Sequence, residues 1–267
     1  MKLGEISERY PALKDVVQRV REVDGIENLY PPQAEAIETG FLDGKNLVLS
    51  IPTASGKTLI AEFALMNEAL GGRKAIYLSP LRALASEKYE EMQEKYGKLV
   101  KIGISTGEYD STGKELAEYD VLILTNEKMD SLMRHGPEWL EKIGLVVIDE
   151  IHLLNDRSRG PTLEVVITKL MDKNVQFLAL SATIENSEEL AEWLEADLVQ
   201  SEFRPVQLSR GVFLDNEITF KEKDDQKFEA PPGADPMTLL TTDIIQKNAQ
   251  SLVFVNTRRG AEKEAEE

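Results

Sequence analysis

Residues 51–58 read Ile-Pro-Thr-Ala-Ser-Gly-Lys-Thr and lie between a short apolar run and a stretch with helical spacing. The apolar run, residues 46–51, is rich in strand-forming residues, as expected of a buried parallel strand. A turn that ends a strand and opens a helix aims backbone N–H groups and the positive end of the helix dipole at phosphate oxygens. The segment therefore predicts a phosphate-binding loop in an α/β fold.

Several residues of this loop are suited to binding a nucleoside triphosphate. Lys57 would reach the β- and γ-phosphates, and the Thr58 hydroxyl would ligate Mg²⁺. Gly56 lets the backbone approach the phosphates without a Cβ in the way. The usual glycine pattern is incomplete, because Ile51 and Ala54 stand where many relatives of this loop have glycine. The expected ATP-binding residues of the loop are Thr53, Ala54, Ser55, Gly56, Lys57 and Thr58.

A second apolar run, residues 144–148, ends in Asp149 and Glu150. Ligands of open parallel sheets bind at the carboxyl ends of the strands. We assign Asp149 to the metal, usually through water, and Glu150 to the attacking water, which it would orient and activate. The sequence thus predicts a nucleoside triphosphate and Mg²⁺ as cofactors and Glu150, Asp149 and Lys57 as catalytic residues; the family resemblance described next implies that the nucleotide is ATP.

The order of these segments resembles a known family. Residues 149–152, Asp-Glu-Ile-His, resemble the D-E-x-H box of superfamily 2 helicases. The closest resemblance is to the archaeal Ski-type helicases, also called Holliday-junction-migration helicases, in which the departures at Ile51 and Ala54 are usual. Further segments fall where that family has its motifs, namely residues 30–33, 79–85, 105–107, 125–128, 159–164, 181–183 and 252–259.

The resemblance implies roles for further residues. Gln33 would read adenine with its amide, the alternative being a glutamine that only starts a helix after two prolines. His152, Ser181 and Thr183 would couple the ATP site to the nucleic-acid face, although Ser181 and Thr183 could equally cap a strand end. Residues that mostly follow predicted strands would contact the sugar-phosphate backbone of a nucleic acid. They are Arg82, Thr106, Gly107, Thr125, Lys128 and Arg159.

Net charge argues against tight nucleic-acid binding. The chain has 31 basic and 48 acidic residues, a formal net charge of −17. The part before Val206 has 23 basic and 36 acidic residues, and the rest has 8 and 12. Proteins that bind nucleic acids without sequence preference are usually basic. We therefore expect weak, local contacts to single strands.

Six predicted strands, around Leu47, Ala75, Val100, Val121, Val146 and Phe177, alternate with helical stretches. This alternation predicts a parallel, doubly wound sheet over residues 1–205, led into by a helical stretch at 1–28. The resemblance implies that this part is a RecA-like motor domain. Residues 202–205 mark a boundary. Residues 206–267 are predicted to be a hinge and the incomplete start of a second RecA-like domain. Within them we expect strands at 206–213 and 251–255, helices at 237–247 and from 258, and a loop at 230–236.

The resemblance implies an ATP-dependent 3′–5′ DNA helicase that acts in replication-fork and recombination repair on single-stranded or forked DNA. Recombination or repair proteins are candidate partners, and we expect a monomer. In this family the arginine finger belongs to later motifs of the second motor domain, which would follow residue 267. We therefore expect this chain to be a fragment that does not unwind DNA by itself. An RNA helicase of the same superfamily and an ATP-binding interaction module remain alternatives.

Residue types and segments that the sequence lacks exclude several kinds of site and of protein. The chain has no cysteine, which excludes disulfides and cysteine metal sites, and its two histidines are too few for a histidine cluster. It has no apolar run of about 18 residues and no signal peptide. We expect a cytoplasmic protein with no membrane partner.

Overall fold

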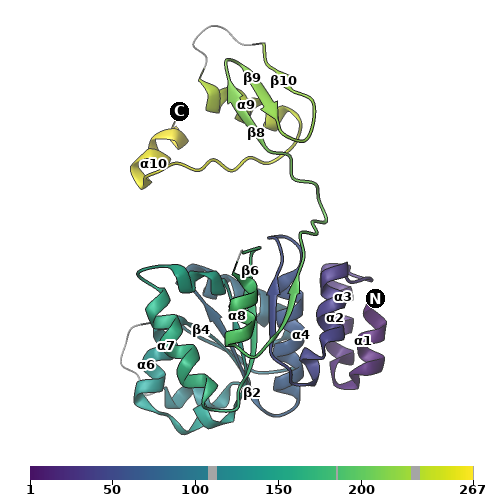
Figure 1. The fold of residues 1–267 in the computed structure, drawn as a ribbon, viewed down its shortest axis with the longest axis vertical. Helices are drawn as coiled ribbons and strands as arrows, with labels where there is room; N and C mark the ends of the chain where they lie inside the picture. Colours follow the sequence, from purple (N-terminus) through teal and green to yellow (C-terminus); the bar gives the residue numbers. More distant parts are fainter. Residues whose placement is uncertain (108–112, 185, 230–234, 267) are drawn as a thin grey trace. The chain divides into compact units, whose positions relative to one another are not determined.

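The computed structural model describes residues 1–107, 113–184, 186–229 and 235–266, and Figure 1 shows the path of the chain. The chain forms two compact units, Met1–Pro205 and Val206–Glu267. None of the helices in the described ranges is both long and apolar enough to cross a membrane. The first unit contains the phosphate-binding segment, so its sheet sets the geometry of the candidate site.

Seven parallel strands form the sheet of the first unit, in the order β3-β4-β2-β5-β6-β1-β7. They are β1 (Leu47–Ser50), β2 (Lys74–Ser79), β3 (Ile102–Ser105), β4 (Val121–Thr125), β5 (Ile143–Ile148), β6 (Gln176–Ser181) and β7 (Asp197–Gln200). The predicted α/β, RecA-like parallel fold is confirmed. The sequence did not predict β7, because this edge strand buries only Val199 and lacks a continuous apolar run.

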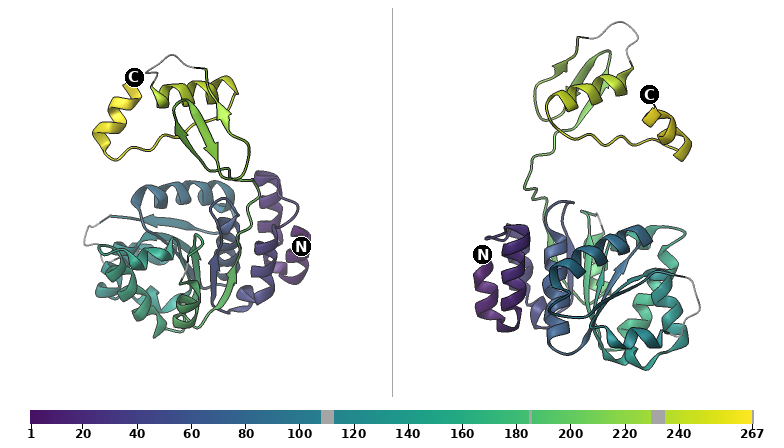
Figure 2. Two further views of the ribbon diagram at one scale, coloured as in Figure 1. Left: turned by 45° about the horizontal axis from the view of Figure 1, so that its top comes forward. Right: turned by 180° about the vertical axis from the view of Figure 1, so that it is seen from behind.

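Helices cover both faces of this sheet (Figure 2). Alternate residues of each strand point to opposite faces, so Leu47 and Leu49 pack in one core while Val48 packs in the other. Helices α1 (Leu3–Arg9), α2 (Lys14–Asp24), α3 (Pro31–Thr39), α4 (Lys57–Leu70) and α5 (Arg82–Tyr96) contribute to the first core. Helices α6 (Asn126–His135), α7 (Gly160–Met171) and α8 (Ser187–Trp193) contribute to the second.

Short 3₁₀ segments connect these elements. They lie at Pro11–Leu13, Phe41–Asp43, Lys114–Glu118, Glu138–Lys142 and Ile151–Asn155. The first of them interrupts the predicted N-terminal helical stretch at Pro11, where the fixed backbone of proline favours the start of a new turn.

A buried ion cluster ties the N-terminal helices to the rest of the unit. The Lys95 ammonium group lies 2.7 Å from Glu62 Oε2 and also contacts Asp24 of α2. The Tyr96 hydroxyl donates to the same Glu62 oxygen over 2.6 Å. Because Glu62 lies on α4, the helix that follows the phosphate-binding loop, the N-terminal helices are fixed to that helix.

The order of the strands brings the predicted site segments to one edge. Strands β2, β5, β6 and β1 are successive neighbours in the sheet. Ser50 is paired with Ser181, and Leu78 with Ile148, so these parallel strands end close to one another. The residues that follow them therefore share the carboxyl edge of the sheet.

The second unit contains a three-stranded antiparallel sheet, β10-β9-β8, and two helices. Its elements are β8 (Gly211–Leu214), β9 (Glu217–Phe220), β10 (Gln226–Lys227), α9 (Pro236–Gln246) and α10 (Arg258–Glu266). Both predicted helices of this unit are confirmed. The loop predicted at 230–236 lies largely outside the described residues, although Asp235 caps α9 by accepting a hydrogen bond from the Thr238 N–H over 2.7 Å.

One strand prediction in this unit is confirmed only in its last residues, and another is wrong. The strand expected at 206–213 begins only at Gly211. Residues 251–255 form no strand, and the side chains of Leu252 and Phe254 are 78% and 86% exposed. Apolar character alone does not make a strand, because its N–H and C=O groups need a neighbouring strand. Within the described ranges, residues 251–255 pair with none.

Candidate functional site

The phosphate-binding loop leads directly from β1 into α4, as predicted. Gly56 precedes the helix with φ 82°, and a Cβ there would lie 2.1 Å from Nε2 of Gln33. The positive φ favours glycine, and a Cβ here would displace the Gln33 amide. The first turn of α4 begins at Lys57, so the N–H groups without a partner inside the helix lie beside this loop. Thr53 and Ala54 are exposed, and Ala54 adopts φ 67°.

Lys57 lies near both predicted catalytic carboxylates. Its Nζ donates to the Ile51 carbonyl over 3.0 Å, so the side chain folds back across the loop. Burial lowers the pKa of Lys57, while the charges of Glu150 and Asp149 raise it. A charge acts on another in this way only when the two are close. The carboxyl edge of the sheet thus brings Lys57, Asp149 and Glu150 together.

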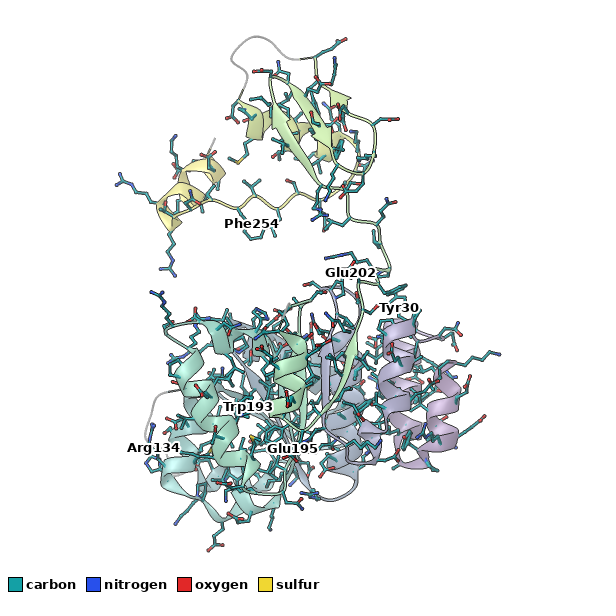
Figure 3. All side chains as sticks on the ribbon, viewed as in Figure 1. Tyr30, Arg134, Trp193, Glu195, Glu202 and Phe254 are labelled. Carbon is teal, nitrogen blue, oxygen red and sulfur yellow. The ribbon has the colours of Figure 1, made fainter. Side chains whose placement is uncertain are left out.

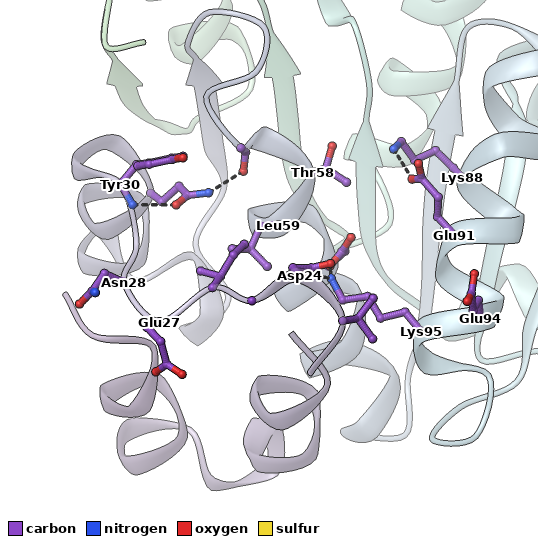
Figure 4. A pocket seen from close by; sticks show the side chains of 16 residues that line it. Asp24, Glu27, Asn28, Tyr30, Thr58, Leu59, Lys88, Glu91, Glu94 and Lys95 are labelled. Carbon is purple, nitrogen blue, oxygen red and sulfur yellow. Dashed lines mark hydrogen bonds and ion pairs between the residues drawn. The ribbon is translucent and has the colours of Figure 1, made fainter. Parts of the chain in front are cut away.

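Gln33 closes over the loop. It is 2% exposed, its Oε1 accepts from the Tyr30 N–H over 2.8 Å, and its Nε2 donates to the Gly56 carbonyl over 2.9 Å (Figure 4). The side chain therefore starts helix α3 and also holds the loop. A side-chain amide can accept two hydrogen bonds through its oxygen and donate two through its nitrogen. The Gln33 oxygen can therefore accept one more hydrogen bond, and its nitrogen can donate one more. Reading of adenine by Gln33 stays a prediction.

Ser55 makes a contact that the sequence did not indicate. Its side chain is fully buried, and its hydroxyl donates to the carbonyl of Phe203 over 2.6 Å. The Phe203 ring lies against that of Tyr30, with 5.3 Å between the ring centroids. In Figure 3, Tyr30 and Glu202 lie at the same end of the first unit, away from Glu195. Since 148 residues separate Ser55 from Phe203, no local pattern could reveal this contact.

Asp149 is held by two donors. The buried hydroxyl of Tyr77 donates to Oδ2 over 2.7 Å, and the Glu150 N–H donates to Oδ1 over 3.0 Å. Burial and the neighbouring charge of Asp149 raise the pKa of Tyr77, which keeps its hydroxyl protonated and able to donate. Glu150 adopts φ 50°, an uncommon conformation for a non-glycine residue. The sequence does not single out Tyr77, because nothing in strand β2 distinguishes it from a core tyrosine.

His152 connects Glu150 to the end of β6. Its Nδ1 lies 3.3 Å from Glu150 Oε2 and 3.3 Å from the Ser181 hydroxyl. The structure thus brings together two of the three predicted coupling residues. Thr183, the third, is exposed and lies two residues beyond the strand. Their coupling role stays a prediction.

The oxygen donors near the loop fit Mg²⁺. The Thr58 hydroxyl and the Asp149 carboxylate are hard oxygen ligands, the type that Mg²⁺ prefers. Across the described ranges, no group of three or more His, Cys, Asp or Glu residues is placed to hold a metal. Mg²⁺ in nucleotide sites is commonly held by one or two protein ligands together with phosphate oxygens. A metal here would therefore depend on the nucleotide.

A pocket of about 880 Å³ opens beside Gln33, Gly56, Thr58 and Tyr30 (Figure 4). It extends along α5, where the Lys88 ammonium lies 2.6 Å from the Glu91 carboxylate. The pocket thus lies next to the phosphate-binding loop and Gln33.

A second pocket, of about 370 Å³, gathers the predicted nucleic-acid residues. All six of them line it, namely Arg82, Thr106, Gly107, Thr125, Lys128 and Arg159. They come from segments that are far apart in the chain but follow neighbouring strands. Glu127, Ser131 and Arg134 also line the pocket and were not predicted. The shared location is established by the structure, while their binding of nucleic acid stays a prediction.

A family model described as DEAD/DEAH box helicase matches residues 30–190. The chain is 51% identical over 250 residues to ATP-dependent DNA helicase Hel308 of Thermococcus kodakarensis, a match to 93% of this chain and 22% of that protein. It is 48% identical over 270 residues to the Methanocella arvoryzae protein of that name, covering 98% of this chain and 35% of the relative.

The Hel308 protein of Pyrococcus abyssi is 45% identical over 266 residues, a match to 99% of this chain and 36% of that protein. The chain thus spans between 22% and 36% of the length of these three relatives.

Proposed function

This chain belongs to the DEAD/DEAH box helicase family, and we propose that its first unit binds and hydrolyses ATP as part of an ATP-dependent DNA helicase. The observation that carries this proposal is that Lys57, after β1, and Asp149 and Glu150, after β5, share the carboxyl edge of the sheet, where only β6 separates the two strands. The names of the relatives, all ATP-dependent DNA helicases, support DNA as the nucleic acid.

The loop would bind the phosphates. The N–H groups at the start of α4 donate to phosphate oxygens, and the Lys57 ammonium leaves the Ile51 carbonyl to neutralise the terminal phosphates. Thr58 and Asp149 would hold Mg²⁺, which supplies charge neutralisation at the phosphates when it is bound. The Gln33 amide, adjacent to Gly56, would contact adenine with its remaining donor and acceptor.

Glu150 would orient the attacking water and accept its proton. The short distance to His152 places an imidazole beside this carboxylate, and Ser181 extends the contact to the end of β6. Movement of Glu150 would therefore displace His152 and, through it, Ser181 at the end of β6, two residues before Thr183. This path supports the proposed coupling between ATP hydrolysis and the nucleic-acid pocket.

The pocket that contains Arg82 and Arg159 would hold the sugar-phosphate backbone of a single strand or a fork. Its hydroxyls, glycine N–H and cations suit phosphate contacts without base readout. By resemblance we further propose the Ski-type branch, 3′–5′ polarity, a role in fork and recombination repair, and recombination or repair proteins as partners. Residues 206–267 would serve as a hinge and the start of a second RecA-like domain.

The Glu150→Gln substitution tests the hydrolysis step. The amide keeps the size of the side chain but cannot accept a proton, so ATP turnover should fall about 100-fold or more. Binding of a fluorescent ATP analogue should change little. Phosphate release and analogue fluorescence would be measured on the same samples. Glu189→Gln, on the exposed face of α8, is the control. Equal turnover in the Glu150→Gln variant and the wild type would contradict the proposal.

Competition between matched DNA and RNA strands tests the choice of nucleic acid. Fluorescence anisotropy of a labelled single strand would report displacement by unlabelled DNA or RNA of the same sequence. Preference for DNA is expected. Preference for RNA would support the alternative function, that of an RNA helicase, because a protein that prefers RNA must contact the 2′-hydroxyl.

A further inference from the structure

Tyr77 lies in the middle of β2 with its ring in the first hydrophobic core, where it is 1% exposed. A phenylalanine would fill the same apolar space. The hydroxyl needs a partner at this depth, because an unpaired buried hydroxyl is costly. Its partner is Oδ2 of Asp149 at 2.7 Å, on the neighbouring strand β5. The one polar atom of the side chain is thus directed at the carboxylate assigned to the metal.

The hydrogen bonds at Asp149 leave a defined set of free lone pairs. A carboxylate has about four acceptor positions, two on each oxygen. Tyr77 occupies one on Oδ2, and the Glu150 N–H occupies one on Oδ1. One position on each oxygen remains. With a donor on both sides, the carboxylate plane cannot rotate without losing a hydrogen bond, so the free positions keep a fixed direction.

We propose that Tyr77 is a positioning residue for the metal site: its buried hydroxyl fixes the orientation of Asp149, and thereby sets the affinity of the nucleotide-bound site for Mg²⁺. This inference rests on the proposed ATP binding. Donors that orient a ligating group in this way commonly change metal affinity when they are removed. The effect would pass through Asp149, because the hydroxyl donates its hydrogen bond to that residue.

The test is the Tyr77→Phe substitution in the whole chain. Binding of a fluorescent, non-hydrolysable ATP analogue would be titrated with Mg²⁺, and binding of Mn²⁺ would be followed by water proton relaxation. We expect the metal concentration at half saturation to rise about 10-fold. Affinity for the analogue without metal should stay unchanged, because the phosphate-binding loop is untouched.

Tyr96→Phe is a matched control. Tyr96 is also fully buried, and its hydroxyl also donates to a buried carboxylate, Glu62 Oε2, over 2.6 Å. The two substitutions therefore remove equivalent hydrogen bonds from the same core, and both should lower thermal stability. Only Tyr77→Phe should change the metal titration. An equal shift in both variants would mean a general loss of stability and would overturn the inference.

A double substitution tests whether Tyr77 acts through Asp149. In an Asp149→Ala background, Tyr77→Phe should have no further effect on metal binding. A further effect would overturn the inference, as would an unchanged titration for Tyr77→Phe alone. Either result would leave the proposed function intact. If the wild-type chain binds the analogue neither with nor without metal, the proposed function itself fails, and the inference falls with it.

Discussion

The buried hydroxyl of Ser55 donates a hydrogen bond to the carbonyl oxygen of Phe203 over 2.6 Å. This bond joins the phosphate-binding loop to the last residues of the first unit. The Phe203 ring in turn lies against Tyr30, which precedes helix α3. Three segments that are far apart in the sequence thus meet at the loop. A substitution in any one of them should therefore change the position or the mobility of the other two.

Ser55→Ala should loosen the segment around Phe203. The substitution leaves a carbonyl without its partner, at an expected cost of about 1–3 kcal/mol in the free energy of unfolding. Hydrogen–deuterium exchange of residues 201–205 should become faster in the variant. Exchange of strands β4 and β5 should not change. Unaltered exchange at 201–205 would show that the bond does not hold this segment.

Lys57→Ala should abolish binding of nucleotide without lowering the stability of the nucleotide-free chain. Burial lowers the pKa of Lys57, so the unfolded chain binds the proton more tightly than the folded one. The charged side chain therefore lowers the free energy of unfolding at neutral pH. This destabilisation disappears only as the pH rises from the lowered pKa of folded Lys57 to 10.5, the pKa in the unfolded chain. Thermal melting with and without ATP and Mg²⁺ measures both effects.

In that experiment, the wild type should gain thermal stability on adding nucleotide, and Lys57→Ala should not. Lys14→Ala, at an exposed position on α2, should behave as the wild type. A melting temperature without nucleotide that falls in Lys57→Ala alone would argue against the predicted cost of burying this charge.

Gly56→Ala should destabilise the chain more than Gly25→Ala. Both glycines have positive φ, but a Cβ at Gly25 would meet nothing within 4 Å, whereas one at Gly56 would lie 2.1 Å from Gln33 Nε2. The strained backbone alone costs about 1–2 kcal/mol, and moving the Gln33 amide off its hydrogen bond to the Gly56 carbonyl should add about 1 kcal/mol. Urea unfolding gives both values. Gln33→Ala should restore part of the loss in Gly56→Ala, and additive effects would rule out the clash.

Arg159→Ala should weaken binding of single-stranded DNA uniformly across sequences. If Arg159 contacts a phosphate, its loss also lowers the slope of log affinity against log salt by about one unit. Anisotropy titrations at several salt concentrations test this. Arg9→Ala, on α1, should leave the slope unchanged. Since the net charge is −17, binding by the wild type should already be weak at physiological salt, and tight, salt-insensitive binding would contradict the assignment.

The free energy of unfolding should fall as pH rises above 10. Burial and the Glu62 carboxylate raise the pKa of Tyr96, and burial and Asp149 raise that of Tyr77, above the ordinary value of 10.0. Above that pH the unfolded chain releases these protons while the folded chain retains them, so stability decreases. Urea unfolding from neutral pH upward measures the decrease. It should be smaller in the Tyr77→Phe, Tyr96→Phe double variant.

Local patterns in the chain were enough to predict the fold class of the first unit. Six inner or edge strands were visible as apolar runs, and the helix after Gly56 followed from its spacing. These signals are local, since burial of a parallel strand on both faces demands a continuous apolar run. The same reasoning failed at residues 251–255, where apolar residues lie in an unpaired segment, and at β7, which is only partly buried.

Residue types alone indicated the loop and the Asp149-Glu150 pair, while the candidate nucleic-acid residues followed from the family resemblance. Their arrangement required the fold. Tyr77 and Asp149 are 72 residues apart, and Ser55 and Phe203 are 148 apart. Such pairs meet only because β1 lies between β6 and β7, and β5 beside β2, an order that sequence spacing does not specify. The sequence thus indicated which residue types could bind a nucleotide. The hydrogen-bond partners that orient these residues depend on which strands become neighbours in the sheet.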